Sequence, residues 1–163
     1  MVNENCRQCS GTTRSGNICR RRTCRGNLCW THLKMEKNLR VKTATTAGMG
    51  LGLFTTRARY PGNLTDVKYT GAHMTGAQYH ELYPDNVPKP EYMLCNNAET
   101  NCIDGKAITS SFARFINHDP VKANVEFGRF DRGPPAHFKF NTIRHIPAGG
   151  ELFADYGDEY HFV

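Results

Sequence analysis

The sequence predicts a mostly β fold built from several small sheets, preceded by a small cysteine-rich module. From about residue 40 the chain consists of brief apolar stretches, rich in β-branched and aromatic residues, that glycine and proline interrupt. Strands do not alternate with long helical patterns, so a parallel sheet with crossover helices is not expected. Five of the seven cysteines lie within residues 6–29. We therefore expect two units, a module at 1–36 and a main domain at 37–163.

Short strands should account for most of the main domain. They are expected at 40–46, 50–56, 66–71, 92–95, 101–108, 124–130, 137–146 and 151–156. Thr75 and Gln78 have the spacing of a capping box, which predicts a short helix over 75–83. Asp104 followed by Gly105 is typical of a hairpin turn.

The positive charge is concentrated at the N-terminus. Residues 1–42 contain ten Lys/Arg and two Asp/Glu, whereas the rest of the chain contains 11 and 13. This asymmetry favours an acidic partner such as nucleic acid for the module; a solvated basic face is the alternative. No aromatic residue is interleaved with the arginines at 20–25. The chain has neither an apolar run long enough for a membrane span nor the apolar core of a signal peptide, so we expect a soluble, intracellular protein.

The cysteines of an intracellular chain are more typical of a metal site than of disulfides. A closed tetrahedral zinc site needs four ligands, and the module offers six candidates: Cys6, Cys9, Cys19, Cys24, Cys29 and His32. The segment from residue 9 to 32 resembles small Cys/His modules that read C-x-G-T-T-x-x-G-x-x-C-R-R followed by C-x-x-H.

That resemblance implies one set of zinc ligands: Cys9, Cys19, Cys29 and His32. Cys6 and Cys24 are then spare or belong to a second, incomplete site. Cys95 and Cys102 have no candidate co-ligands nearby in the sequence, so we expect buried free thiols there. A segment this short, with few large apolar residues, needs the metal in order to fold.

Several motifs of the main domain occur in a specific order. They are GMGLGLF at 48–54, YTG at 69–71, IDG at 103–105, ARFINH at 113–118, an Asn-Val pair at 124–125 and GEL followed by DYG at 150–157. Each is weak alone: the glycines fit a hairpin, Asn-His fits a loop, and a tyrosine after a strand fits a core. In this order they closely resemble the SET domain of protein-lysine methyltransferases, from about residue 40 to 163.

The resemblance implies a SET (β-clip-like) fold in which the segments around 114–118 and 155–157 pass through one another as a pseudoknot. It also implies S-adenosylmethionine as cofactor. The residues expected to bind it are Met49, Gly50, Leu51, Asn117, His118 and Tyr156. Tyr156 is the expected catalytic residue. Tyr69 is expected either as a second wall of the lysine channel or as a packed strand aromatic.

The chain departs from the family at three places. Asp119 stands where Ser or Cys is usual, and the loop to Asn124 is one residue longer. Ala154 occupies a position that is often Phe or Tyr; it leaves room for more methyl groups unless Phe127 fills the space. The segment after Tyr156 lacks the family's Cys-rich closure, so Tyr160 and Phe162, or a second subunit, are expected to close the channel. Compact viral SET proteins with a similar YGDDY ending are dimers, which makes a homodimer one alternative.

The leading hypothesis is a lysine methyltransferase that acts on a histone or another basic protein tail in the nucleus or on chromatin. The acidic residues Asp155, Asp158 and Glu159 suit a basic peptide, or form a solvated turn. The alternative is a non-enzymatic chromatin or nucleic-acid adaptor that uses the SET core as a scaffold. Intact Asn117, His118 and Tyr156 favour the enzyme.

Overall fold

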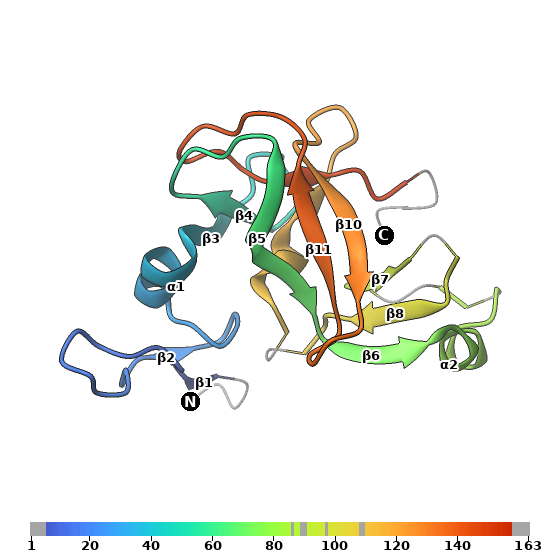
Figure 1. The fold of residues 1–163 in the computed structure, drawn as a ribbon, viewed down its shortest axis with the longest axis horizontal. Helices are drawn as coiled ribbons and strands as arrows, with labels where there is room; N and C mark the ends of the chain where they lie inside the picture. The colour runs from blue at the N-terminus through green and yellow to red at the C-terminus, as the bar shows by residue number, and fades with distance from the viewer. Residues whose placement is uncertain (1–5, 86, 89–90, 97, 108–109, 158–163) are drawn as a thin grey trace.

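The computed structural model describes residues 6–85, 87–88, 91–96, 98–107 and 110–157 (Figure 1). Its elements, in chain order, are β1 Arg7–Gln8, β2 Arg22–Thr23, α1 Trp30–Lys37, β3 Leu39–Thr43, β4 Leu51–Thr55, β5 Gly62–Thr70, β6 Ala72–Thr75, α2 Gly76–Leu82, β7 Met93–Cys95, β8 Asn101–Asp104, the 3-10 helix η1 Phe112–Phe115, β9 Asn117–His118, β10 Val125–Asp131, β11 His137–Thr142 and β12 Phe153–Ala154. Within the described residues the strands form four small sheets, which confirms the predicted class.

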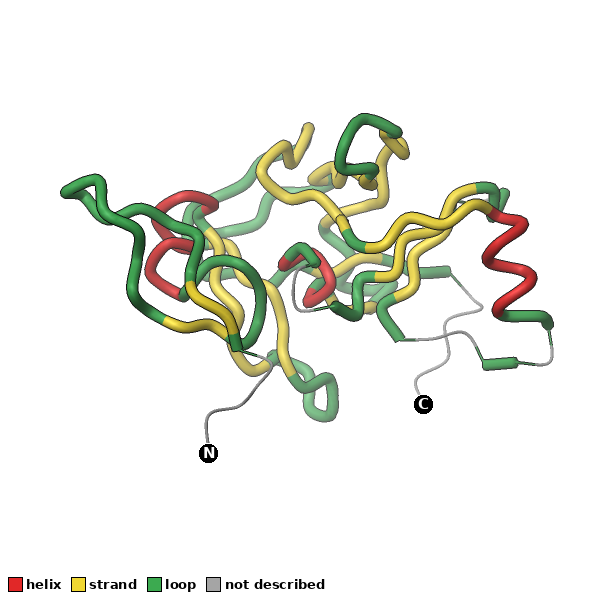
Figure 2. Tube along the Cα trace, turned by 90° about the horizontal axis from the view of Figure 1, so that it is seen from below, coloured by secondary structure: helices red, strands yellow, loops and turns green. Residues whose placement is uncertain are grey.

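The N-terminal module consists of the β1–β2 hairpin, its long connecting loop and α1. It lies to one side of the sheets (Figures 1 and 2). The sequence motifs did not predict α1, whose apolar side is narrow: only His32 and Leu33 of this helix are buried. Asn38 ends the helix in the left-handed conformation and leads directly into β3. The proposed division between residues 36 and 37 stays a prediction.

The largest sheet has the strand order β5-β11-β10-β12-β9. β12 pairs in parallel with β10 through Val125 and Ala154, and with β9 through Asn117 and Phe153. The strand formed by residues 153–154 therefore lies between two strands that precede it in the chain, and the connection over 119–124 must pass it. This is the threaded arrangement that the resemblance implies.

A three-stranded sheet, β6-β8-β7, lies at the end of the domain with α2 beside it (Figure 1). The capping box is confirmed: Thr75 caps Gln78, and the Gln78 side chain returns to the Thr75 backbone. The predicted hairpin turn at Asp104-Gly105 is wrong. β8 ends there and pairs only with β6 and β7 among the described strands, and Asp104 Oδ1 instead accepts from the Lys106 N–H at 2.7 Å in a local turn.

Two pairs of cysteines form disulfides, which corrects the expected free or spare thiols. Cys95 and Cys102 are direct partners in the β7–β8 register and are bonded to each other. Cys6 and Cys24 face each other across the β1–β2 ladder, one position beyond the Arg7–Thr23 pair, and are also bonded. Strand register, which brings residues far apart in sequence face to face, decides both pairings.

The module joins the main domain through the segment that precedes β9. Gly26 packs so closely on the Phe112 ring that an added Cβ would lie 2.4 Å from it. The Arg114 guanidinium donates to the carbonyls of Gly105, Lys106, Ala107 and Arg25. Buried residues from both parts form one apolar core, which includes Cys9, Leu28, Leu33, Leu39, Leu53, Phe115 and Ile116.

Within the described part of the chain, no helix is long and apolar enough to cross a membrane.

Candidate functional site

The glycine loop, residues 44–50, connects β3 to β4. Gly48 and Gly50 have φ angles of 87° and 64°, which side-chain-bearing residues rarely adopt. A Cβ at either position would meet open space, so these two residues leave their backbone accessible to a ligand. The predicted cofactor-binding residues Met49, Gly50 and Leu51 lie at the end of this loop, and its base is closed by the Ala44 N–H donating to Gly50 O at 2.9 Å.

Asn117 and His118 form β9, which is the edge strand of the largest sheet as described. The Asn117 amide Nδ2 donates to Leu51 O at 3.2 Å and to Glu151 Oε1 at 3.1 Å. The structure thus places the two predicted cofactor segments side by side, and the Asn117 side chain connects them. The Asn117 amide nitrogen is thus engaged in hydrogen bonds within the protein.

Tyr156 follows β12 and lies beside His118. The Tyr156 N–H donates to His118 Nδ1 at 2.9 Å, and the two rings are 5.6 Å apart. The Tyr156 hydroxyl donates to the carbonyl of Ile116. Phe127 packs against the Tyr156 ring at 5.3 Å, while Ala154 is fully buried in β12. Phe127 therefore occupies space beside the tyrosine, on the strand adjacent to Ala154.

Tyr69 lies on β5 and is almost completely buried. Its hydroxyl donates to the carbonyl of Tyr92. Burial raises the pKa of this hydroxyl well above its usual value, and the nearby Tyr156 adds to the effect, so Tyr69 is protonated at neutral pH. Gly105 permits the arrangement, because an added Cβ there would lie 2.6 Å from the hydroxyl oxygen. This environment suits a packed strand aromatic, which is one of the two roles expected for Tyr69. The other role, as a wall of the lysine channel, stays a prediction.

Glu151 is a buried residue of the site that the sequence motifs did not single out. Its Oε2 accepts from the Thr45 backbone N–H at 2.8 Å and from the Thr45 hydroxyl, while Oε1 accepts from Asn117. A Cβ at Gly52 would lie 2.0 Å from Oε1, so Gly52 admits this carboxylate and not a ligand. The sequence did contain one signal for this role, which is an acidic residue at the start of an apolar strand. A carboxylate is buried in such a place only when it is hydrogen-bonded, so the pattern indicates that Glu151 has hydrogen-bond donors nearby.

Asp119, which stands where the family usually has Ser or Cys, makes hydrogen bonds within its own loop. Its Oδ1 accepts from the backbone N–H groups of Val121 and Lys122, and its Oδ2 lies 3.0 Å from Lys122 Nζ. The Lys122 N–H is the main reason that the pKa of Asp119 is lowered. Lys122 Nζ also donates to Thr46 Oγ1 at 3.0 Å, which joins the 119–124 loop to the glycine loop.

The expected metal ligands come together in the N-terminal module. One donor atom from each of Cys9, Cys19, Cys29 and His32 lies within 4.8 Å of the others, and all four residues are buried. The Sγ atoms of Cys9 and Cys29 are each 3.4 Å from His32 Nδ1. Zinc–sulfur bonds of about 2.3 Å and zinc–nitrogen bonds of about 2.0–2.1 Å in a tetrahedron require about 3.6 Å between such atoms. The four residues therefore fit a zinc ion.

Surrounding groups suit the same ion. The second ring nitrogen of His32, Nε2, donates to Thr12 O at 3.0 Å, which directs Nδ1 towards the three thiols. The Cys29 N–H donates to Cys9 Sγ at 3.1 Å. Burial raises the pKa of the Cys29 thiol, but hydrogen bonds from its neighbours, first the His32 backbone and ring, outweigh burial and lower the pKa to about 6. Thiolates are the form that binds zinc.

Two predictions concern residues outside the described part of the chain. The first is that Asp158 and Glu159 are acidic groups for a basic peptide. The second is that Tyr160 and Phe162 close the lysine channel.

Comparison with known proteins identifies the family to which the fold belongs. The family model described as SET domain matches residues 50–157. The chain belongs to the SET-domain family. A search of curated protein sequences gave no match.

Similar solved structures come from a chromatin complex. A crystal structure of the Chaetomium thermophilum polycomb repressive complex 2 shares 25% identity at a TM-score of 0.57, covering 76% of this chain and 16% of that one. A structure of the same complex with H3K27me3 shares 26% at a TM-score of 0.59, covering 78% and 15%. The autoinhibited complex bound to S-adenosylmethionine, at 24% identity and a TM-score of 0.56, has the same fold over 77% of this chain and 16% of its own. The chain thus spans about one sixth of the length of these proteins.

Proposed function

We propose that the protein is an S-adenosylmethionine-dependent protein-lysine N-methyltransferase. Membership of the SET-domain family supports this class of activity. The observation that carries the proposal is the insertion of β12 between β9 and β10, which brings Tyr156 and His118 within a hydrogen bond of 2.9 Å. The same insertion holds Asn117 Nδ2 3.2 Å from the Leu51 carbonyl oxygen, at the start of β4 directly after the glycine loop.

The cofactor would be held by the chain's own backbone and by the open space around two glycines. Met49, Gly50 and Leu51 would bind its methionine part, and the outward peptide groups of Asn117 and His118 its adenine part. The open positions at Gly48 and Gly50 fit such a ligand. When bound, S-adenosylmethionine supplies an electrophilic methyl group on a sulfonium.

Tyr156 would orient the substrate amine. Its hydroxyl donates to the Ile116 carbonyl, and a phenol oxygen that donates one hydrogen bond can also accept an N–H from a lysine amine. A lysine with a pKa of about 10.4 is uncharged in about one molecule per thousand at pH 7.4. The aromatic side chains of Tyr69, Phe127 and Tyr156 would exclude water and thereby favour the uncharged amine. Holding the amine in line with the methyl group supplies the rest of the rate enhancement.

A histone or another basic protein tail is the proposed substrate, and chromatin in the nucleus the proposed location. The support is the similar complex solved with H3K27me3, together with the small excess of acidic over basic residues in the segment 43–163. Asp155, more than half exposed beside the site, would attract basic residues that flank the target lysine. A homodimer that closes the lysine channel stays a prediction, which light scattering of the purified chain tests.

The deciding experiment is methyl transfer from labelled S-adenosylmethionine to core histones, with Tyr156→Phe beside the native chain. We expect label on lysine, reduced about 100-fold by the variant because the amine loses its orienting oxygen. Tyr60→Phe is the matched control, since Tyr60 is exposed and pairs with His145 instead. Calorimetric titration with S-adenosylhomocysteine checks that Tyr156→Phe retains its cofactor site.

Failure to label histones, nucleosomes and a cell extract, together with no binding of the cofactor product, would contradict the enzyme and leave the adaptor. Cofactor binding without transfer would contradict only the histone substrate.

A further inference from the structure

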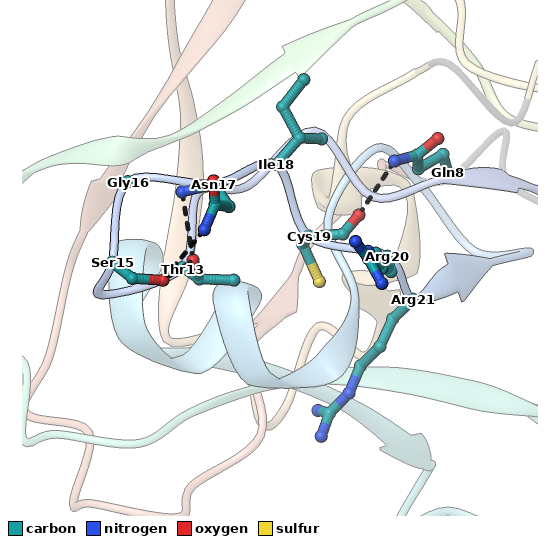
Figure 3. Close-up of a pocket in the computed structure, with 9 residues that line it drawn as sticks. All are labelled: Gln8, Thr13, Ser15, Gly16, Asn17, Ile18, Cys19, Arg20 and Arg21. Atoms are coloured by element: carbon teal, nitrogen blue, oxygen red, sulfur yellow. Dashed lines mark hydrogen bonds between the residues drawn. The ribbon is translucent and has the colours of Figure 1, made fainter.

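An open hollow lies on the N-terminal module, between the loop after β1 and the start of β2 (Figure 3). Its volume is about 980 Å³. It is lined by Gln8, Thr13, Ser15, Gly16, Asn17, Ile18, Cys19, Arg20 and Arg21. A second hollow of about 250 Å³ shares Thr13, Cys19 and Arg21 with it and continues past Arg14 to Thr31, His32 and Met35 on α1. Neither lining contains a carboxylate and arginines line both, so the surface along both hollows is positively charged.

The charge around these hollows is strongly one-sided. Residues 6–42 contain ten Lys/Arg and a single acidic residue, Glu36. Arg14, Arg20 and Arg21 line the hollows themselves. The one acidic residue, Glu36, is close enough to act on His32 of the second hollow, but the arginines outnumber it. A surface with such an excess of arginines attracts a polyanion, and guanidinium groups bind phosphate oxygens in two-point contacts.

An exposed aromatic ring completes the surface. Trp30, the single tryptophan of the chain, is 67% exposed at the start of α1. The Arg21 guanidinium lies over its ring at 5.1 Å. The two residues are nine positions apart in the sequence, so the fold, and not the local pattern, places an aromatic face beside the arginines. Ile18 and Met35, also exposed, extend the apolar contact along the hollows.

We propose that this surface binds single-stranded nucleic acid. The backbone phosphates lie along Arg14, Arg20 and Arg21, and an unpaired base stacks on Trp30. Stacking on an exposed aromatic ring next to a basic groove is how proteins hold single strands without reading their sequence. A duplex does not offer an unpaired base, and an acidic peptide offers no flat ring to the tryptophan. The proposal is independent of methyl transfer and goes beyond it.

The experiment uses the full zinc-loaded chain and labelled 15-nucleotide oligomers of U and of dT. Because Trp30 is the only tryptophan, quenching of intrinsic fluorescence reports directly on its stacking. We expect quenching on titration, and an affinity by anisotropy that falls steeply with salt. Trp30→Ala should weaken binding about five-fold or more. Arg20→Gln should lower the slope of log affinity against log salt by about 0.7.

The matched control is Arg144→Gln, which removes one exposed arginine from the main domain and should leave affinity unchanged. Zinc content and melting temperature of each variant exclude misfolding as the cause of a loss. Polyglutamate and a 15-base-pair duplex are titrated as competing classes of ligand. Equal affinity for polyglutamate would overturn the proposal. Tighter binding of the duplex without quenching of the tryptophan fluorescence would also overturn it. So would binding that Trp30→Ala leaves intact.

Discussion

The Glu151 carboxylate lies 3.1 Å from the Asn117 amide and 2.8 Å from the Thr45 backbone N–H. One buried side chain at the start of the C-terminal segment therefore connects the glycine loop with the strand that carries Asn117 and His118. Gly52 is the residue that makes room for it. Glu151 touches neither proposed ligand, so it is a positioning residue for the cofactor site.

Glu151→Gln should weaken binding of S-adenosylhomocysteine about 10-fold. Glutamine has one acceptor oxygen instead of two and would turn its NH2 group towards a donor, either Thr45 or Asn117. Losing a hydrogen bond to a charged group costs about 1.5–3 kcal/mol. Calorimetric titration measures the affinity, and the methylation rate at saturating cofactor should change much less.

Glu126→Gln is the matched control, because Glu126 is exposed and its Oε1 accepts a hydrogen bond from Asn141 on the neighbouring strand, away from the glycine loop. Unchanged cofactor affinity in Glu151→Gln would contradict the positioning role that we assign to the Glu151 carboxylate.

Single Cys→Ser variants should divide the cysteines of the module into two groups. Cys9→Ser, Cys19→Ser and Cys29→Ser should each lose bound zinc, because each removes one of four tetrahedral donors. Cys6→Ser should retain the metal, since Cys6 is bonded to Cys24 and lies outside the cluster. Elemental analysis of the purified variants measures zinc per chain. Zinc loss in Cys6→Ser would show that the disulfide-bonded pair contributes to the site.

Gly26→Ala should disturb the cofactor site from the module. Its methyl group would lie 2.4 Å from the Phe112 ring, and η1 continues directly into β9. Overpacking of this kind costs about 1–3 kcal/mol. We expect a lower melting temperature and weaker cofactor binding together. Gly16→Ala is the control for backbone strain, because Gly16 has a positive φ and its added methyl group would meet open space. It should lower the melting temperature slightly and leave cofactor affinity unchanged.

Asp119→Asn tests the charge in the 119–124 loop. The pKa of Asp119 is lowered in the folded chain, chiefly by the Lys122 N–H, so its carboxylate stabilises the fold above the pKa of the unfolded chain. That contribution is lost as the pH falls through the lower, folded pKa. The variant should therefore melt below the native chain at pH 7, and the difference should shrink as the pH falls below the unfolded pKa and through the lower, folded pKa. The control is Asp85→Asn, at an exposed position; a difference independent of pH would contradict the role of the charge.

Much of the fold could be predicted from local patterns. The strands over 51–55, 125–131 and 137–142 follow β-branched and aromatic stretches, and the capping box at Thr75 specified the start of α2. The predicted zinc ligands and the segments around Asn117 and Tyr156 are brought together as the resemblance implied.

Other features depended on contacts between distant segments. Asp104-Gly105 has the composition of a hairpin turn, but β8 takes its partners from earlier strands, so the turn does not form one. The Cys95–Cys102 bond follows from strand register, and the burial of Glu151 from its contacts with a loop more than one hundred residues earlier. Propensity and spacing carry no information on such pairings.

The position of β12 has a consequence for how the protein is made. β9 and β10 are synthesised before the strand that lies between them, so the largest sheet cannot be completed until residues 153–154 are available to pair. Until then His118 has no Tyr156 to bind, and Asn117 no Glu151. The cofactor site is thus a late product of synthesis, and ribosome-bound chains that end before residue 151 should be unable to retain the cofactor.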